Sequence, residues 1–577
     1  MSSVNRFAVV LFALTVLAAS RLWAAPNFDQ SPFGVNCLKW TEFAKPDRWH
    51  IVSERAAGMK AAGVYWDRDG FDWSTIQKKK GEWDWTWPDK AATLHREQGI
   101  NGVILLCYGA PWRKGPPLND EQRAEYAEYV YQVVNRYKDT FKVWEIWNEP
   151  NIPSFWNPPD VKAYTLMLKE AYKAAKKADP TCTVLAGSVN GPGNDFIEGI
   201  YENGGWDYCD GFSIHPYTMC GGPIEQKLDR MFRHLNALAA SHGSAKPLWV
   251  TEVGFSAKNK DEEERQATQI IQAYIILIAN DVRNIAYFCM DNYKGFGWVT
   301  NFEPLEPKLS FGAVQMMTRI LGSPGPCAPF EGYLKTPDGV SCYVFKKQGN
   351  ERVLVMWSND DQTRTVQLSQ AAGLSAKNIL GKPLSTANGK LEVGPLPIFV
   401  TGADARKIGQ VSRDFNPYLA AEARNLVNNP SFEKIDGDHP ALWNFGRFYR
   451  TDNHGKFAIS DEGRDGSKCV CISGSGADTA IDAGPIPVKP GKKYKLTAWI
   501  KTKDATGVNV AGIWWYNGSQ WRYRGKANSR SINGTQDWTK VEVEGVCPST
   551  APLARIDLIS EGNKGTVWFD DVTLVEE

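Results

Sequence analysis

Short apolar runs alternate with longer amphipathic segments from about residue 33 to about residue 321. The short runs have the length of buried strands, and the longer segments repeat apolar residues at helical spacing. Eight strands are predicted, at residues 33–36, 63–67, 102–108, 143–148, 183–188, 211–215, 248–252 and 284–290. Because eight strands alternating with helices over roughly 250 to 300 residues suit a closed barrel better than an open sheet, we predict a (β/α)8 barrel. It covers residues 32–322.

Beyond the barrel the pattern becomes one of strands alone. Residues 323–329 are rich in Pro and Gly, as linkers often are. Alternating apolar and polar positions then predict a small antiparallel β-sandwich over residues 327–403. Residues 424–577 contain no convincing helical pattern, and their strands predict a jelly-roll β-sandwich. The predicted fold is therefore α/β, a barrel followed by two β-sandwiches.

The first 25 residues have the pattern of a signal peptide. Arg6 precedes an apolar stretch at residues 7–20 that is too short to span a membrane comfortably, and the small residues Ala24 and Ala25 follow it. We therefore expect residues 1–25 to be removed. The mature protein is expected to be secreted or periplasmic, without attachment to a membrane.

Charge and cysteine content limit which binding partners, disulfides and cofactors are expected. The 66 Lys and Arg against 65 Asp and Glu leave a net charge of +1, and no long basic run is present, so no nucleic acid partner is expected. Eleven cysteines cannot all pair, although Cys327 and Cys342 could form one local bridge. No clustered His and Cys spacing indicates zinc, so no cofactor is expected for catalysis. The oligomeric state stays open.

Two glutamates stand at the predicted carboxyl ends of barrel strands. Glu149 follows the fourth strand in VWEIWNEPN, and Glu252 ends the seventh in LWVTEVG. Loops at this end of a (β/α)8 barrel form the active-site cleft. Hydrolysis of a glycosidic bond needs two carboxyl groups, one to protonate the leaving oxygen and one to attack or to activate water. The pair predicts a glycosidase site, although either residue alone could be a solvated or capping Glu.

These motifs resemble those of the clan A glycoside hydrolases, a large group of retaining (β/α)8 enzymes, and are most similar to family thirty-nine β-xylosidases and family five β-glycanases. The resemblance implies Glu149 as acid/base, Glu252 as nucleophile and Asn148 as a contact of the sugar 2-hydroxyl. It implies cleavage of β-linked oligo- or polysaccharides, starting with Glu149 protonated and Glu252 ionised. Burial beside apolar or acidic groups is expected to hold the pKa of Glu149 up, and hydrogen bonds to hold that of Glu252 down.

Two further motifs match the clan. Arg68, after the second strand, stands where the clan has an Arg near the nucleophile, and FSIHPY at the end of the sixth strand supplies His215 and Tyr217, which line the cleft in the clan. A core ion pair of Arg68 with Glu145 and a structural role for His215 are the alternatives. Three tryptophans after strands three, four and eight are candidate sugar platforms or core residues: Trp112, Trp156 and Trp298.

The last block resembles the jelly-roll carbohydrate-binding modules attached to plant-polysaccharide enzymes, on the segments NLVNNPSFE and VWFDDVTL. The resemblance allows a structural calcium at Glu433 and Asp571, since Ca²⁺ takes several oxygen ligands. The candidate sugar-binding surface is an aromatic cluster of Trp514, Trp515, Tyr516 and Trp521. Neighbouring residues of a strand face opposite ways, so one face of this cluster is expected to be core.

Two other functions fit the same residues. A barrel without activity would only bind carbohydrate, which the intact Glu149 and Glu252 disfavour. A transglycosylase passes the glycosyl group to a sugar instead of water, using the same carboxylates. Loop shape selects the sugar and the linkage, so the sequence pattern leaves both open.

Overall fold

The computed structural model describes most of the chain. The described residues are 31–39, 45–191, 194–217, 228–241, 246–302, 304–360, 362–417, 425–427, 429–433, 435–436, 439–440, 442–445, 455–464, 468–474, 476, 479–517 and 522–577. The predicted signal peptide at residues 1–25 lies outside them. Within this part of the chain, no helix has the length and apolar character needed to cross a membrane.

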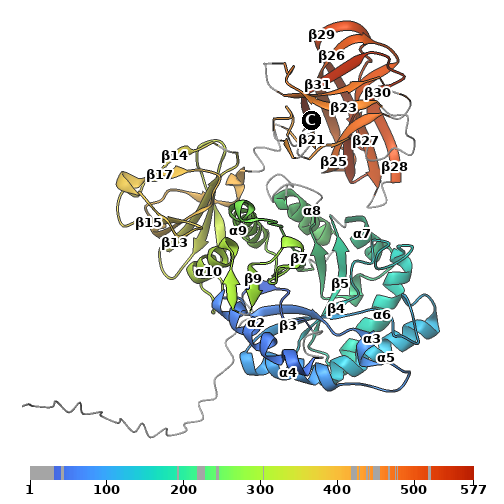
Figure 1. Ribbon diagram of the computed structural model, residues 1–577, viewed down its shortest axis with the longest axis vertical. Helices are drawn as coiled ribbons and strands as arrows, with labels where there is room; N and C mark the ends of the chain where they lie inside the picture. Colours follow the sequence, from blue (N-terminus) through green and yellow to red (C-terminus); the bar gives the residue numbers. More distant parts are fainter. Residues whose placement is uncertain are drawn as a thin grey trace, which may run out of the picture.

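Eight parallel strands close into a barrel in which each strand pairs with the next and β8 pairs with β1. They are β1 (Phe33–Val35), β2 (Trp66–Gly70), β3 (Asn101–Leu106), β4 (Val143–Ile146), β5 (Thr183–Asn190), β6 (Gly211–His215), β7 (Leu248–Val253) and β8 (Ile285–Tyr287). The predicted barrel is confirmed, and it forms the blue and green part of the ribbon in Figure 1. The second strand begins at Trp66 rather than Gly63, because Gly63 adopts φ +75° in the turn that follows the preceding helix.

Helices connect the strands, and local sequence sets their ends. They are α2 (Trp49–Ala61), α3 (Trp73–Ile76), α4 (Thr86–Gln98), α5 (Asp120–Tyr137), α6 (Val161–Ala178), α7 (Asn194–Glu202), α8 (Leu228–Ser241), α9 (Glu263–Ala279) and α10 (Leu309–Leu321). Asn119 and Gln122 form a reciprocal capping box at the start of α5. The Asp160 side chain caps α6 by accepting from the Ala163 N–H. A hairpin of β9 (Val299–Phe302) and β10 (Leu305–Pro307) follows β8.

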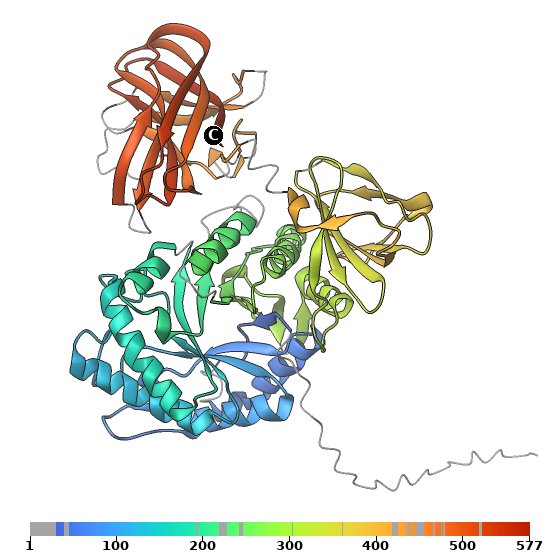
Figure 2. The ribbon, with the colours of Figure 1, turned by 180° about the vertical axis from the view of Figure 1, so that it is seen from behind.

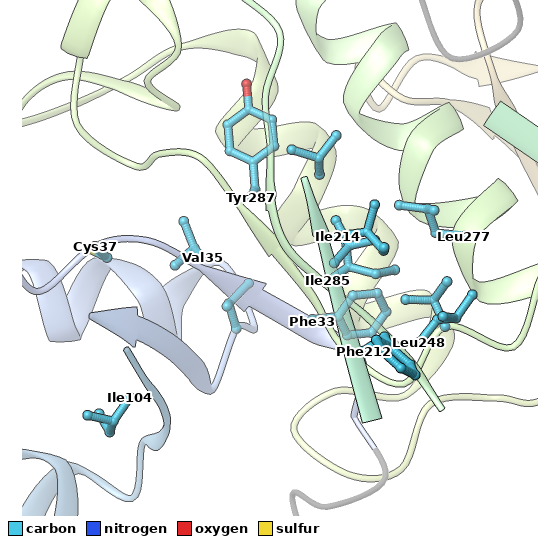
Figure 3. Close-up of a cluster of buried hydrophobic side chains, with 14 of the residues drawn as sticks. Phe33, Val35, Cys37, Ile104, Phe212, Ile214, Leu248, Leu277, Ile285 and Tyr287 are labelled. Atoms are coloured by element: carbon cyan, nitrogen blue, oxygen red, sulfur yellow. The ribbon is translucent and has the colours of Figure 1, made fainter. Parts of the chain in front are cut away.

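Apolar side chains pack on both faces of the barrel strands. Figure 3 shows Phe212, Ile214, Leu248 and Ile285 with Leu277 of α9 in one buried cluster, which lies between the strands and the surrounding helices. A second cluster comes from the first half of several strands, and its members are Trp66, Val103, Val143, Leu185 and Trp249. This packing closes the amino end of the barrel, so the polar residues of the interior gather at the carboxyl end.

A seven-stranded sheet, in the order β16-β15-β18-β13-β12-β11-β19, follows α10. Its strands are β11 (Phe330–Leu334), β12 (Val340–Lys346), β13 (Glu351–Ser358), β15 (Ser375–Asn378), β16 (Pro383–Leu384), β18 (Ile398–Asp404) and β19 (Val411–Ser412). One face shares the hydrophobic cluster of the barrel through residues such as Tyr343 and Trp357. The other face packs with the two-stranded sheet of β14 (Arg364–Gln367) and β17 (Lys390–Val393), so the barrel and this region form one packed unit.

The prediction that Cys327 and Cys342 could form a local disulfide is wrong. Both cysteines are free, as are the other cysteines of the described chain. Cys342 lies in the core between the sheets of the small sandwich, whereas Cys327 packs against the cluster shared with the barrel. The two thiols therefore belong to opposite faces of the sheet.

The carboxyl-terminal part forms two five-stranded sheets, β22-β25-β30-β27-β28 and β23-β24-β31-β26-β29, around a separate core. The strands are β22 (Asn444–Phe445), β23 (Lys456–Ser460), β24 (Cys469–Ser473), β25 (Ala480–Pro487), β26 (Lys493–Ala505), β27 (Val508–Asn517), β28 (Arg522–Asn528), β29 (Gly534–Val546), β30 (Leu553–Glu561) and β31 (Thr566–Glu576), after a short pair β20 (Ile435–Asp436) and β21 (His439–Pro440). Figure 2 shows this sandwich in orange and red, as a lobe beside the barrel. The predicted β-rich carboxyl-terminal region is confirmed.

Candidate active site

Glu149 and Glu252 meet at the carboxyl end of the barrel. Glu149 follows β4, and Glu252 is the penultimate residue of β7. A ligand atom of each glutamate and of His215 lies within 4.8 Å of the others. The side chains of Glu149 and Glu252 are only 7% and 15% exposed. The fold therefore brings together the two carboxyl groups that the strand-end motifs predicted.

The chain turns sharply after β4 to present Glu149. Trp147 and Glu149 have φ angles of +67° and +42°, in a backbone region that residues other than glycine rarely adopt. The Glu149 N–H donates to the Ser188 carbonyl at 2.9 Å. Asn190 Nδ2, at the end of β5, donates to Glu149 Oε1 at 2.9 Å. Backbone strain of this kind persists at functional sites because the surrounding structure holds it in place.

Arg68 of β2 links the ends of β4 and β7. Its Nη1 donates to Glu252 Oε1 at 2.5 Å, and its Nη2 donates to Asn148 Oδ1 at 3.0 Å. Its Nε donates to Glu145 Oε2 at 2.7 Å. Both roles considered from the sequence are therefore present, since Arg68 forms a buried ion pair with Glu145 and also places its positive charge against Glu252.

His215, at the end of β6, lies between the two carboxyl groups and is fully buried. Its Nδ1 is 2.8 Å from Glu149 Oε1 and 3.9 Å from Glu252 Oε2. Its Nε2 is 3.0 Å from Thr251 Oγ1. The Tyr217 hydroxyl donates to Glu252 Oε2 at 3.1 Å. The FSIHPY motif thus supplies one hydrogen-bond partner to each glutamate, His215 to Glu149 and Tyr217 to Glu252.

The pKa of Glu149 departs from the sequence-based expectation. Burial raises the pKa of this carboxyl, but the hydrogen bond and charge of His215, together with Asn190 and Arg68, outweigh burial and hold the pKa of Glu149 below its usual value. The expectation that its surroundings hold this pKa up is therefore wrong, because they are hydrogen-bond donors rather than apolar or acidic groups.

Several residues that complete the site were not among the predicted site residues. Glu145 was considered only as an ion-pair partner, and Thr251, Ser188 and Asn190 were not singled out. Glu145 carried a usable signal, since a charged residue inside the apolar segment VWEIW must find a polar partner when it is buried. Thr251 and Ser188 carried no such signal in the sequence, because Thr and Ser are ordinary residues in strands.

The predicted sugar platforms of the barrel have different environments. Trp156 and Trp298 are 1% and 0% exposed. The Trp156 ring packs edge-on against Trp147 at 5.3 Å, and the Trp298 ring stacks on Tyr287 at 5.2 Å. Neither ring has a free face for a sugar, so these two predictions are wrong and both residues belong to the core. Trp112 is only half-buried, and its role as a platform stays a prediction.

In the carboxyl-terminal sandwich, the two faces of β27 differ. Trp515 is 3% exposed and lies in the core between the sheets, so its prediction as a surface residue is wrong. Trp514 and Tyr516 point to the opposite face because strand residues alternate. Trp514 is half-buried and Tyr516 is almost covered. Trp521 lies outside the described residues.

Charged side chains surround Trp514 on this outer face. Lys526 Nζ lies 4.5 Å from the centre of the Trp514 ring, and the Tyr523 ring lies 5.5 Å from it. Arg555 donates to both oxygens of Asp557 at 2.5 and 2.6 Å. Aromatic rings beside fixed polar groups are suited to stack on a sugar and to donate or accept its hydrogen bonds. We call this set of five residues the outer-face cluster.

The residues predicted to bind calcium already have protein partners. Asp571 Oδ2 lies 3.1 Å from the Arg464 guanidinium, and Asp571 Oδ1 accepts from Ser431 Oγ at 2.8 Å. Glu433 Oε1 accepts from the Lys468 N–H at 2.9 Å. Because an arginine already balances the charge of Asp571, these residues fit calcium poorly. Calcium stays a prediction here, and melting the protein with and without a chelator tests it.

Two family models match separate parts of the chain. Residues 94–294, within the barrel, match the model described as "Cellulase (glycosyl hydrolase family 5)". Residues 443–574, within the carboxyl-terminal sandwich, match a carbohydrate-binding-module model described as "BppA domain 1".

Two solved structures resemble this chain at low sequence identity. A family 39 glycoside hydrolase from the gut symbiont Bacteroides cellulosilyticus WH2 superposes with a TM-score of 0.53 at 20% identity, over 62% of this chain and 79% of that chain. A family 39 β-xylosidase from Caulobacter crescentus gives a TM-score of 0.48 at 14% identity, over 65% of this chain and 96% of that chain. The first likeness shows a common fold and nothing finer.

Curated proteins match only over short segments. The tRNA nuclease WapA of Bacillus subtilis (strain 168) is 40% identical over 52 residues, which is 8% of this chain and 2% of that protein. The tRNA(Glu)-specific nuclease WapA of Bacillus subtilis subsp. natto (strain BEST195) is 40% identical over 55 residues, 9% of this chain and 2% of that protein. This chain thus spans about 2% of the length of the curated relatives it matches, too little to assign their activity to it.

Proposed function

We propose that this chain, which carries a glycosyl hydrolase family 5 domain at residues 94–294 and a carbohydrate-binding-module-like domain at residues 443–574, is a secreted retaining glycosidase of β-linked oligo- or polysaccharides. The placement of Glu149 and Glu252 carries the finer part of the proposal, because an oxygen of each lies within 4.8 Å of the other. Retaining glycosidases hold their carboxyl groups about 5–5.5 Å apart, whereas inverting enzymes leave about 6.5–9.5 Å for a water.

In the first step Glu149 gives its proton to the glycosidic oxygen while a Glu252 oxygen attacks the anomeric carbon. The carbon–oxygen bond to the leaving sugar breaks, and a glycosyl ester of Glu252 forms. In the second step ionised Glu149 removes a proton from water, which attacks the same carbon and releases the Glu252 carboxylate.

The neighbours of Glu252 fix it before substrate arrives. Arg68 Nη1 and the Tyr217 hydroxyl donate to different oxygens of this carboxylate, at 2.5 and 3.1 Å. Asn148 turns its carbonyl oxygen to Arg68, which leaves its amide nitrogen to donate to the sugar 2-hydroxyl. A preset orientation lowers the entropy that the reaction must lose on the way to the transition state.

The substrate class is tested by a screen of dinitrophenyl and nitrophenyl β-glycosides together with β-linked polysaccharides. Release of phenol or reducing sugar by the wild-type protein supports the proposal, and its absence across the whole panel contradicts it. Analysis of the products then separates hydrolysis from transfer to a sugar acceptor.

From the outer-face cluster we predict that the carboxyl-terminal sandwich binds polymeric substrate. Trp514→Ala removes a ring that can stack on sugar, and it should reduce activity on an insoluble polysaccharide several-fold by removing tethering. Activity on a small aryl glycoside should not change, since the barrel and the sandwich have separate cores. The ratio of the two activities is the measurement.

Trp538→Ala, a half-buried tryptophan of β29 in the other sheet, is the matched control and should leave that ratio at the wild-type value. An unchanged ratio in the Trp514 variant as well would mean that this face does not bind the polymer.

A further inference from the structure

Glu145 is a buried carboxylate in the barrel interior and is 0% exposed. Its Oε2 accepts from Arg68 Nε at 2.7 Å, and its Oε1 accepts from Thr251 Oγ1 at 2.6 Å. Burial raises the pKa of Glu145, but Arg68, His215 and neighbouring hydroxyls bring it below the usual value. An ionised carboxylate can only accept hydrogen bonds, so the single hydroxyl proton of Thr251 points to Glu145.

This arrangement determines which nitrogen of His215 carries a proton. Thr251 Oγ1 lies 3.0 Å from His215 Nε2, and it can only accept there because its own proton is already donated. The Ser188 hydroxyl, at 3.2 Å, is the other neighbour of Nε2. We assign the proton to Nε2, and Glu145 thereby fixes the tautomer through Thr251.

With Nε2 protonated, a neutral His215 turns the lone pair of Nδ1 toward Glu149 Oε1, which is 2.8 Å away. A lone pair and a carboxylate oxygen repel each other at that distance, so a proton must lie between them. It sits either on Glu149 beside a neutral His215 or on Nδ1 beside an ionised Glu149. Both arrangements contain the same number of protons, so the two residues share one proton between them.

We propose that Glu145 and Thr251 are positioning residues, which make Glu149 and His215 hold one shared proton for the leaving glycosidic oxygen. This inference rests on the proposed glycosidase function and deepens it. When the proton leaves, the Nδ1 lone pair faces an ionised Glu149, and this repulsion makes Glu149 a stronger base toward the water of the second step. One proton departs with the leaving sugar and one returns from water, so the cycle balances.

Other charges face the pair from neighbouring strands. Glu252 Oε2 lies 3.9 Å from His215 Nδ1 and favours retention of the proton, as does ionised Glu145. Arg68 opposes it, because its positive charge favours ionised Glu149. These groups are the same in the variants below, so a change in the pH profile of the enzyme reports the tautomer.

Thr251→Val tests the inference because it removes the hydroxyl and keeps the shape. A neutral His215 can then place its proton on Nδ1 and donate to ionised Glu149, which lowers the proton affinity of the pair. The basic limb of the pH profile of kcat/KM, which reports the essential acid of the free enzyme, should move to lower pH by about one unit or more. The profile is measured with a substrate whose leaving group needs a proton.

Three comparisons separate positioning from general damage. Thr251→Ser restores the hydroxyl and should return the wild-type profile. Thr318→Val removes a buried hydroxyl that donates to the Ala62 carbonyl at 2.7 Å, away from the site, and should leave the profile unchanged. With a dinitrophenyl glycoside, whose leaving group needs no acid, glycosylation by the Thr251 variant should fall less than it does with the substrate that needs a proton.

A basic limb that stays in place in Thr251→Val, or that moves equally in Thr251→Ser, overturns the inference. If the valine variant does not fold, ¹⁵N NMR of histidine in the wild-type protein decides, with the His215 signal assigned against His215→Gln among the seven histidines. A neutral Nε2–H tautomer or a doubly protonated ring is expected, because either carries a proton on Nε2, and a neutral Nδ1–H tautomer contradicts the inference. Absence of any wild-type hydrolysis refutes the glycosidase instead, and leaves the tautomer measurement to stand by itself.

Discussion

Glu252→Ala is expected to reduce turnover by on the order of 10⁵-fold or more, because no covalent glycosyl intermediate can form without the attacking carboxylate. The substitution leaves a small space at the anomeric carbon. Azide can enter that space and attack an activated β-glycoside directly. The product should be the α-glycosyl azide, with inverted configuration, identified by NMR.

Glu264→Ala serves as the matched control, since Glu264 is an exposed residue of α9. This variant should keep wild-type kcat and KM. Wild-type-like turnover by Glu252→Ala, or a rescued product of the β configuration, would contradict the role of Glu252 as nucleophile.

Glu149→Ala should produce a loss that depends on the leaving group. Natural oligosaccharides need a proton on the departing oxygen, so their cleavage should fall by roughly 10²–10⁴-fold. Dinitrophenyl glycosides need no proton and should still form the glycosyl ester of Glu252, giving a burst followed by slow hydrolysis. Azide should accelerate the second step and yield the β-glycosyl azide.

The two variants are thus expected to give azides of opposite configuration, which identifies each carboxylate independently of the size of its loss. Equal losses on both classes of substrate by Glu149→Ala would mean that Glu149 has a structural role only.

The barrel and the pairing of the glutamates were predictable because they depend on order along the chain. Parallel strands bring their carboxyl ends to one rim, so Glu149 and Glu252 had to lie on the same side of the barrel once the strands were identified. Arg68 and His215 follow from the same rule. None of these placements requires knowledge of how the side chains are turned.

Contacts that depend on register and rotamer were not predictable. The 2.8 Å approach of His215 to Glu149 depends on how both side chains are turned, and the direction of the pKa of Glu149 follows from that approach. The positions of Trp156 and Trp298 after strands did not reveal whether their rings turn to the cleft or to the core. The alternation of side chains along a strand showed that Trp514 and Trp515 face opposite ways. Which of the two is buried depends on the position of the second sheet, which the sequence pattern does not give.

The stereochemistry of hydrolysis tests the central claim most directly. A β-glycoside that the wild-type protein cleaves is followed by ¹H NMR from the first minute, before the sugar product mutarotates. Two displacements, one by Glu252 and one by water, predict that the β-anomer appears first and that the α-anomer grows in only as mutarotation proceeds. First appearance of the α-anomer would show a single displacement, and it would contradict the assignment of Glu252 as a nucleophile.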